Sequence, residues 1–148
     1  MLSRTILLTA VLSGAMFSSS AHADSIMQVY KSEYCGCCND WITHVESAGI
    51  KVEAVNIDDI YGKKAELGLP QELASCHTGV IDGYLIEGHV PADDILRLLK
   101  EKPVIKGLSV PGMPHGSPGM ETGRLDHYRV FAFDQSGQAP EVWSEYNK

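Results

Sequence analysis

The chain has 148 residues with 12 basic and 19 acidic side chains, so its formal charge is −7 at pH 7. An acidic protein is a poor partner for the phosphates of nucleic acids or for an anionic membrane surface, and the charge argues against both as ligands. The chain also has 4 cysteines, 5 methionines and 6 histidines, which are side chains able to bind soft metal ions.

Residues 1–23 have the features of a cleaved export signal. Arg4 supplies the positive start, residues 6–16 are mostly apolar, and the small residues that follow end in Ala21-His22-Ala23. The apolar stretch is shorter than the ~20 residues that a membrane-spanning helix needs, which favours cleavage after Ala23 over a retained anchor. The sequence therefore predicts a periplasmic single domain of residues 24–148, with no membrane association after cleavage.

The first elements after the signal have the order of a βαβ unit. Residues 27–30 form a short β-favouring run that leads into a Cys-Gly-Cys-Cys motif at 35–38. Apolar residues from Trp41 onward recur at helical spacing, and Gly49 is a typical helix end. Apolar and polar residues then alternate from 50 to 57, which is typical of a half-buried strand.

The middle of the chain is less regular, but it contains one strong turn signal. Asp82-Gly83 stands between two apolar runs, as in a two-residue hairpin turn. The predicted elements are a helix at 60–67, a further turn after Pro70, strands at 77–81 and 84–87, and a helix from Pro91.

The last part of the chain changes character. Residues 107–123 contain five Gly and three Pro, which is too many for a regular element. Residues 128–133 and 141–143 then predict a second hairpin around residues 135–138. The order of elements predicts an α/β protein with a thioredoxin-like βαβαββα core, followed by a C-terminal Gly/Pro-rich loop and a β-hairpin.

The Cys-Gly-Cys-Cys motif carries the main chemical signal. Cys35 and Cys38 form a C-x-x-C pair at a helix start, where free N–H groups and the helix dipole stabilise thiolates. Cys37 adds a third soft donor within one turn, a crowding that suits Cu(I), or more than one copper ion, better than a single disulfide. In a thioredoxin-like order, Cys76 and His77 lead into the third strand and lie beside this helix start, so both are candidate ligands.

Three other interpretations of the cysteines stay open. Four cysteines in an exported protein ordinarily form two disulfides, for example Cys35–Cys38 with Cys37–Cys76, and such a metal-free form is compatible with a copper-bound one. A thiol–disulfide oxidoreductase is the second, although a third thiol beside the pair invites reshuffling. A zinc site of three cysteines and His77 is the third, although the crowded spacing differs from usual zinc motifs.

The Gly/Pro-rich loop supplies two further candidates, Met113 and Met120. A thioether binds copper and does not lose this ability through thiol oxidation. The alternative is that both methionines fill gaps in the core, but a loop so rich in Gly and Pro has little core to fill.

The remaining histidines are weaker candidates. His89, just before a proline, is expected to be structural or exposed. His44 lies about two helical turns beyond the motif, roughly 10 Å by the helix rise, which is too far to share its metal. The sequence does not fix a role for His115 or His127.

Several motifs in order make the chain resemble the CopG-type copper-resistance proteins. They are the motif at 35–38 with Trp41, Ser75-Cys76-His77-Thr78, Asp82-Gly83-Tyr84, the segment 87–92, and the loop segments 110–114 and 116–120. The resemblance covers nearly all of residues 24–148. It implies a thioredoxin-like periplasmic protein that binds Cu(I), supports copper tolerance and cycles copper between Cu(I) and Cu(II), which makes it a candidate oxidoreductase.

The resemblance also implies a ligand set and a class of partner. Carried over by matching position, the ligands are Cys35, Cys37, Cys38, Cys76, His77, Met113 and Met120. Besides copper ions, the expected partner is a periplasmic protein that donates or accepts copper.

Overall fold

The computed structural model describes residues 25–135 and 139–148. The predicted export signal at 1–23 lies outside the described residues, and so does part of the predicted turn at 135–138; the leader and the single domain stay predictions. In chain order the elements are β1 (Ile26–Lys31), α1 (Gly36–Ser47), β2 (Lys51–Asn56), α2 (Ile60–Glu66), the short 3-10 helix η1 (Gln71–Leu73), β3 (Thr78–Ile81), β4 (Tyr84–Glu87), α3 (Ala92–Glu101), β5 (Gly107–Ser109), β6 (Tyr128–Phe133) and β7 (Glu141–Tyr146).

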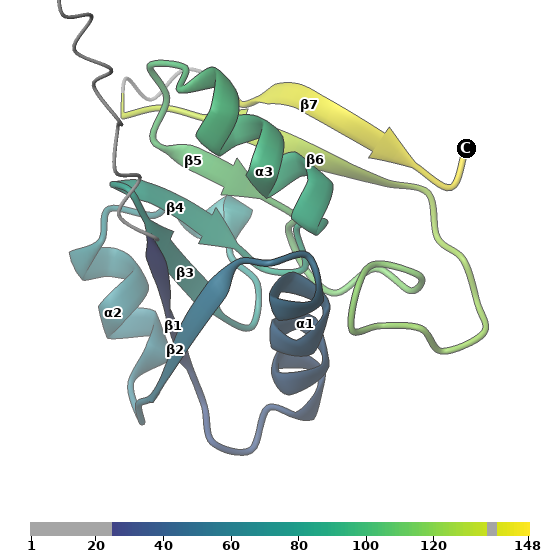
Figure 1. The fold of residues 1–148 in the computed structure, drawn as a ribbon, viewed down its shortest axis with the longest axis horizontal. Helices are drawn as coiled ribbons and strands as arrows, with labels where there is room; N and C mark the ends of the chain where they lie inside the picture. Colours follow the sequence, from purple (N-terminus) through teal and green to yellow (C-terminus); the bar gives the residue numbers. More distant parts are fainter. Residues whose placement is uncertain (1–24, 136–138) are drawn as a thin grey trace, which may run out of the picture.

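The strands form one mixed sheet of seven, in the order β2-β1-β3-β4-β5-β6-β7 (Figure 1). The β1–β2 and β4–β5 pairs are parallel, and the other neighbours are antiparallel. Parallel neighbours need a crossover connection, which α1 and α3 provide. This mixed α/β architecture confirms the predicted thioredoxin-like fold class.

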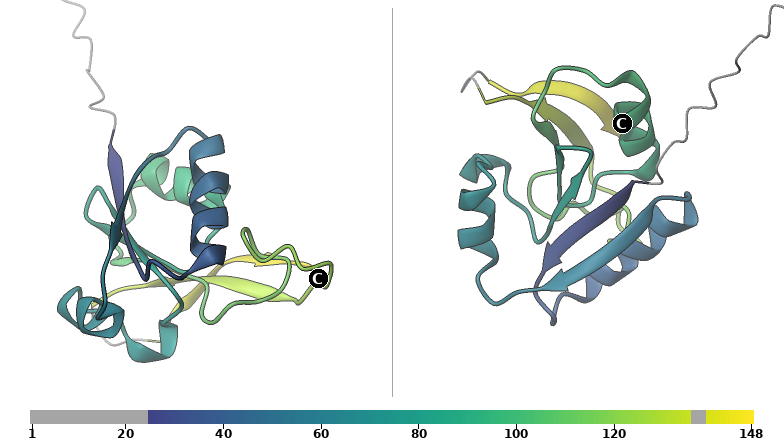
Figure 2. Two further views of the ribbon diagram at one scale, coloured as in Figure 1. Left: turned by 90° about the horizontal axis from the view of Figure 1, so that it is seen from below. Right: turned by 60° about the vertical axis from the view of Figure 1, so that its left-hand side comes forward.

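The helices cover both faces of the sheet. α1 and α3 lie on one side and α2 on the other (Figure 2, right). The larger core packs Trp41 of α1 and Ile95 of α3 against Ile86, while the smaller core under α2 and η1 includes Leu85 and Leu73. Adjacent residues of β4 therefore serve different cores, because successive strand side chains point to opposite faces.

The predicted hairpin turn at Asp82-Gly83 is confirmed. Both residues have left-handed backbones, with φ of +49° and +83°, as a two-residue turn of this type requires. The turn pairs Ile81 with Tyr84 and, three steps further, Thr78 with Glu87. The ladder continues beyond the strands, since the Gly88 N–H donates to the His77 carbonyl at 3.1 Å.

The expectation that residues 107–123 contain no regular element is wrong at its start. Gly107–Ser109 forms β5, which pairs in parallel with β4 and joins the core to the β6–β7 hairpin. A side chain at Gly107 would collide with the Leu85 carbonyl, so glycine is what lets this strand pair. The segment from 110 to 127 is irregular, as predicted, and lies beside α1 (Figure 1).

Within residues 25–135 and 139–148, none of the helices combines the length and the apolar character that crossing a bilayer would require.

Candidate metal centre

The four cysteines meet although they come from two distant parts of the chain. Cys35, Cys37 and Cys38 stand at the start of α1, and Cys76 stands in the loop that leads into β3. The four sulfur atoms, which we call the cysteine cluster, all lie within 4.8 Å of one another. The structure therefore brings together the four cysteines that the sequence proposed as ligands.

The cysteine cluster contains one disulfide, between Cys35 and Cys38, whose Cα atoms are 5.3 Å apart. Cys37 and Cys76 are free thiols, and the Cys37 sulfur lies 3.6 Å from that of Cys35. Of the two disulfides considered from the sequence, the structure contains Cys35–Cys38 and does not contain Cys37–Cys76. Two sulfurs thus remain able to bind metal as they stand, and the other two only after reduction.

A second group of donors shares Cys76. Its sulfur lies 3.4 Å from Nδ1 of His77 and 3.1 Å from Nε2 of His89. We call Cys76, His77 and His89 the imidazole cluster; their ligand atoms also lie within 4.8 Å of one another. Cys76 is therefore the residue at which a sulfur-rich group and a nitrogen-rich group join.

Of the two expectations for His89, exposure is wrong, while a structural role stays a prediction beside a role in the site. The ring is fully buried, and its Nδ1 lies 2.8 Å from the Pro118 carbonyl. A carbonyl only accepts, so Nδ1 carries the proton and Nε2 directs its lone pair at Cys76. Metal-binding histidines are oriented in this way, by a hydrogen bond from the second nitrogen to a carbonyl or carboxylate.

The strand register of the β3–β4 hairpin is the sequence signal that could have placed His89 beside Cys76. A two-residue turn at Asp82-Gly83 pairs residue 81 with 84 and continues outward in equal steps. Extended past the strand ends, the same count places Cys76 opposite His89. The predicted hairpin turn therefore implies that Cys76 and His89 lie opposite each other.

His77 is buried in an apolar and aromatic setting. Its ring lies 4.2 Å from the Trp41 ring by centroids, and its Nε2 has no hydrogen-bond partner among the described residues. Burial, then the neighbouring His89 and Lys64, lower the pKa of His77 well below its usual value. The ring is therefore neutral, which is the form that binds metals. An orphaned buried nitrogen is uncommon in native proteins, so Nε2 of His77 is a candidate donor to a ligand.

Cys76 is held as a protonated thiol when no metal is bound. Burial, with a smaller contribution from Cys37, raises the pKa of Cys76 to about 12. A thiol is a weak nucleophile, so Cys76 resists oxidation in the metal-free protein. Because metals bind the thiolate, copper binding at Cys76 must release a proton.

The Gly/Pro-rich loop closes over the start of α1. At Gly119 a Cβ atom would lie only 2.7 Å from the Cys37 carbonyl and 2.8 Å from the Trp41 nitrogen, so the loop backbone packs directly on the motif. Met120 follows this contact and is half-buried, whereas the Met113 side chain is 52% exposed. Ligation by either methionine stays a prediction.

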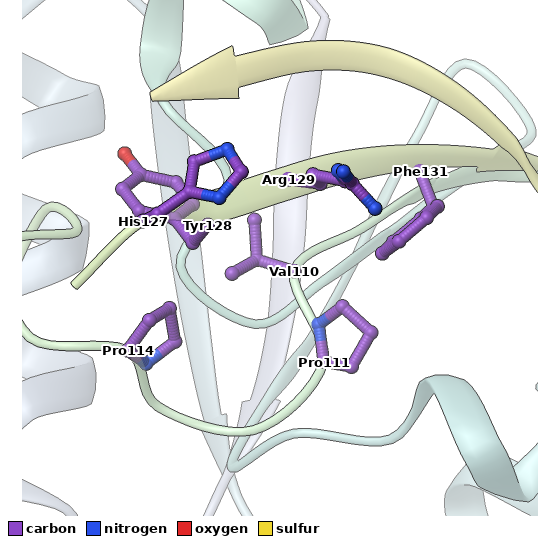
Figure 3. Close-up of a pocket in the computed structure, with 7 residues that line it drawn as sticks. All are labelled: Val110, Pro111, Pro114, His127, Tyr128, Arg129 and Phe131. Atoms are coloured by element: carbon purple, nitrogen blue, oxygen red, sulfur yellow. The ribbon is translucent and has the colours of Figure 1, made fainter. Parts of the chain in front are cut away.

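The other histidines lie outside both clusters. His44 accepts a hydrogen bond from the Ala92 N–H at 3.1 Å, and so links α1 to the start of α3. His115 contacts Thr122 through Nδ1 at 2.6 Å. His127 lines a hollow of about 370 Å³ between the loop and β6 (Figure 3). The residues around this hollow include no cysteine and no methionine: they are Val110, Pro111, Pro114, His127, Tyr128, Arg129 and Phe131.

The donor set fits a soft metal ion. Thiolates favour Cu(I) and zinc, and imidazoles favour copper and zinc, whereas hard cations such as magnesium prefer oxygen. A single zinc ion needs four donors in a tetrahedron, while the two joined clusters offer six side chains around one shared sulfur. The donor set is therefore larger than one tetrahedral zinc ion requires.

Known proteins resemble this chain at the levels of sequence and fold. Residues 73–120, which include the imidazole cluster, match a family described as "Protein of unknown function, DUF411". Two solved structures, named "Copper resistance protein copG- Form 2" and "Copper resistance protein copG- Form 1", are each 49% identical to it. Each comparison covers 83% of this chain and 98% of the other, with TM-scores of 0.78 and 0.77. No match was found among curated proteins.

Proposed function

The chain belongs to the CopG copper-resistance family, and from that premise we propose that it is a periplasmic protein that captures Cu(I) in its cysteine cluster. The observation that carries this proposal is the meeting of four cysteine sulfurs within 4.8 Å. Burying Cu(I) among thiolates keeps it from reacting with oxygen, which is a chemical route to copper tolerance. The predicted export signal supports the periplasmic location.

Copper capture depends on the oxidation state of the Cys35–Cys38 pair. In the disulfide form these two sulfurs are bonded to each other and are not thiolate ligands. Reduction by a dithiol donor transfers two electrons and two protons, opens the bond and yields two thiols, while the donor becomes a disulfide. The full four-sulfur site belongs to this reduced form.

The imidazole cluster supports the finer proposal that bound copper changes oxidation state. Loss of one electron from Cu(I) to an external acceptor gives Cu(II), which prefers nitrogen donors. His77 and His89 supply such donors beside the shared Cys76. The protein would then hold copper in either state within one site.

An anaerobic titration tests the proposal. Reduced protein competes with a chromophoric chelator for Cu(I), beside Cys37→Ser and in the presence and absence of Zn(II). We expect tight uptake of more than one copper ion per chain, a marked loss in the variant, and no displacement by zinc. Weak uptake that the substitution leaves unchanged would contradict a thiolate copper site.

Thiol–disulfide exchange is the second candidate function, and the Cys35–Cys38 disulfide at the start of α1 favours it. It predicts a reduction potential within the range of about −120 to −270 mV found in catalytic pairs, and reduction of protein disulfides at catalytic rates. Equilibration in glutathione buffers measures the potential. A value well below this range would leave copper capture as the function.

A further inference from the structure

A buried carboxylate lies immediately beside the imidazole cluster. Glu87 ends β4 with no exposed surface and accepts three hydrogen bonds. The donors are Lys64 Nζ at 2.5 Å, the Ser75 N–H at 2.6 Å and Thr78 Oγ1 at 2.6 Å. The Lys64 ammonium, itself only 3% exposed, also donates to Thr78 at 2.9 Å.

Stability alone does not account for this arrangement. Removing two charges from water is expensive, and replacing a buried ion pair by apolar side chains of similar size is often neutral or stabilising. A Lys–Glu pair kept in the interior is better explained by a conformation that it specifies. The best-attested use of such groups is to fix one local geometry among several.

The geometry that Glu87 fixes is that of two metal-binding candidates. Ser75 and Thr78 stand directly before and directly after Cys76 and His77. One carboxylate therefore holds the backbone on one side of the pair and a side chain on the other. Lys64 ties the same carboxylate to α2, so that the loop before β3 is held from a helix as well as from β4.

We propose that Glu87, anchored by Lys64, is a positioning residue that fixes Cys76 and His77 in the arrangement that binds copper. This inference rests on the proposed function, because it assigns a role relative to the same site. Glu87 acts through Ser75 and Thr78, and it is not itself a ligand.

The test uses two double variants of the full protein. Lys64→Met with Glu87→Leu removes both charges and all the hydrogen bonds that these two side chains make to Ser75 and Thr78, while keeping side chains of similar size. Lys64→Met with Glu87→Gln also removes both charges but keeps an amide oxygen that accepts from Ser75. The matched control is Asp94→Asn, since Asp94 is also buried and accepts hydrogen bonds from Ser144 at 2.5 Å and Tyr146 at 2.7 Å, away from the clusters.

Two readouts separate positioning from folding. The first is Cu(I) affinity of the reduced protein by chelator competition. The second needs no copper: with the Cys35–Cys38 disulfide intact, iodoacetamide labels the two free thiols, and mass spectrometry gives the ratio of Cys76 to Cys37 labelling. Cys37 is an internal standard, because a general loss of stability exposes both thiols.

We expect the apolar pair to lower Cu(I) affinity by about 10–100-fold, as the loss of outer-shell support does at other metal sites. The labelling ratio should rise by about tenfold, because the Ser75 and Thr78 donors lose a buried acceptor. The amide pair should recover most of the affinity, and Asp94→Asn should change neither readout.

Wild-type affinity and a wild-type labelling ratio in the apolar pair would overturn the inference. If the apolar pair does not fold, Thr78→Val removes one hydrogen-bond donor to Glu87 without changing side-chain shape. Wild-type Cu(I) affinity and a wild-type labelling ratio in this variant would then overturn the inference. Failure of the wild-type protein to bind Cu(I) would instead contradict the proposed function. In that case the labelling ratio still tests whether Glu87 fixes Cys76.

Discussion

The cysteine cluster and the imidazole cluster meet at Cys76, yet the chain builds them in different ways. Three sulfurs of the first come from one short motif at the start of α1, where Cys35 and Cys37 are partly accessible and Cys38 is buried, and the Cys35–Cys38 bond makes this cluster depend on redox state. The histidines of the second are buried, and β3, β4 and the Gly/Pro-rich loop hold them in place. The local motif therefore supplies redox-active thiols. The sheet holds a separate set of donors, which oxidation of the motif leaves intact.

Removing Cys76, the residue that both clusters share, should cause the largest loss of Cu(I) affinity. Cys76→Ser should weaken Cu(I) binding by more than about 100-fold, a larger effect than that of outer-shell changes, because it removes a ligand from each cluster. Cys37→Ser removes a ligand from one cluster and should lose less. Chelator competition measures both variants. Equal losses would mean that Cys76 does not bridge the clusters.

A matched pair of histidine variants tests the imidazole cluster alone. His89→Gln should lower copper affinity by about 10–100-fold, because it removes the nitrogen that faces Cys76. His44→Gln changes a histidine that contacts Ala92 outside the clusters and should keep wild-type affinity. Isothermal titration of the reduced proteins compares them. If the two variants behave alike, His89 is structural, as its sequence position suggested.

Redox state should change the capacity of the site. With the Cys35–Cys38 disulfide intact, two of the four sulfurs are unavailable, so we expect the protein to bind about half as much copper as after reduction. Metal analysis after desalting, with and without a phosphine reductant, measures this. A variant with Cys35 and Cys38 both changed to serine cannot form this disulfide, so its copper capacity should be the same with and without the reductant. Equal capacity of the oxidised and reduced wild-type protein would show that these sulfurs are not ligands.

The smallest expected effect is on stability, and it comes from the loop that packs on the motif. Gly119→Ala and Gly123→Ala place alanine at similar backbone angles, with φ of +83° and +86°, but only the Cβ at 119 would clash with Cys37 and Trp41 atoms. Gly119→Ala should therefore lower the free energy of unfolding by about 1–3 kcal/mol more than Gly123→Ala. Urea unfolding measures the difference. Equal losses would mean that the loop does not pack on the motif.

The sequence predicted the parts of the site that follow from motif and element order. The motif at 35–38 precedes a helix, and in a thioredoxin-like order the loop before the third strand lies beside that helix start. Cys76 was therefore placed correctly against the motif, whereas His77 groups with Cys76 and His89 and not with the motif sulfurs. The Asp82-Gly83 turn was also correct, because its left-handed backbone is encoded locally.

The parts that the sequence did not predict depend on contacts between distant segments. His89 precedes Val90 and Pro91, which suggested a turn, whereas the hairpin register and the Pro118 carbonyl bring it into the site. β5 is only three residues long, and its glycine indicated a loop, although that glycine is what permits the pairing with β4. The role proposed for Glu87 is likewise invisible in sequence, because its partners come from α2, a loop and β3.

The most direct test of a thiolate and imidazole copper site is copper X-ray absorption on reduced protein loaded anaerobically with Cu(I). We predict a copper coordination shell dominated by sulfur, with a smaller nitrogen contribution that decreases in His89→Gln. A first shell of nitrogen and oxygen alone, unchanged in Cys76→Ser, would contradict it.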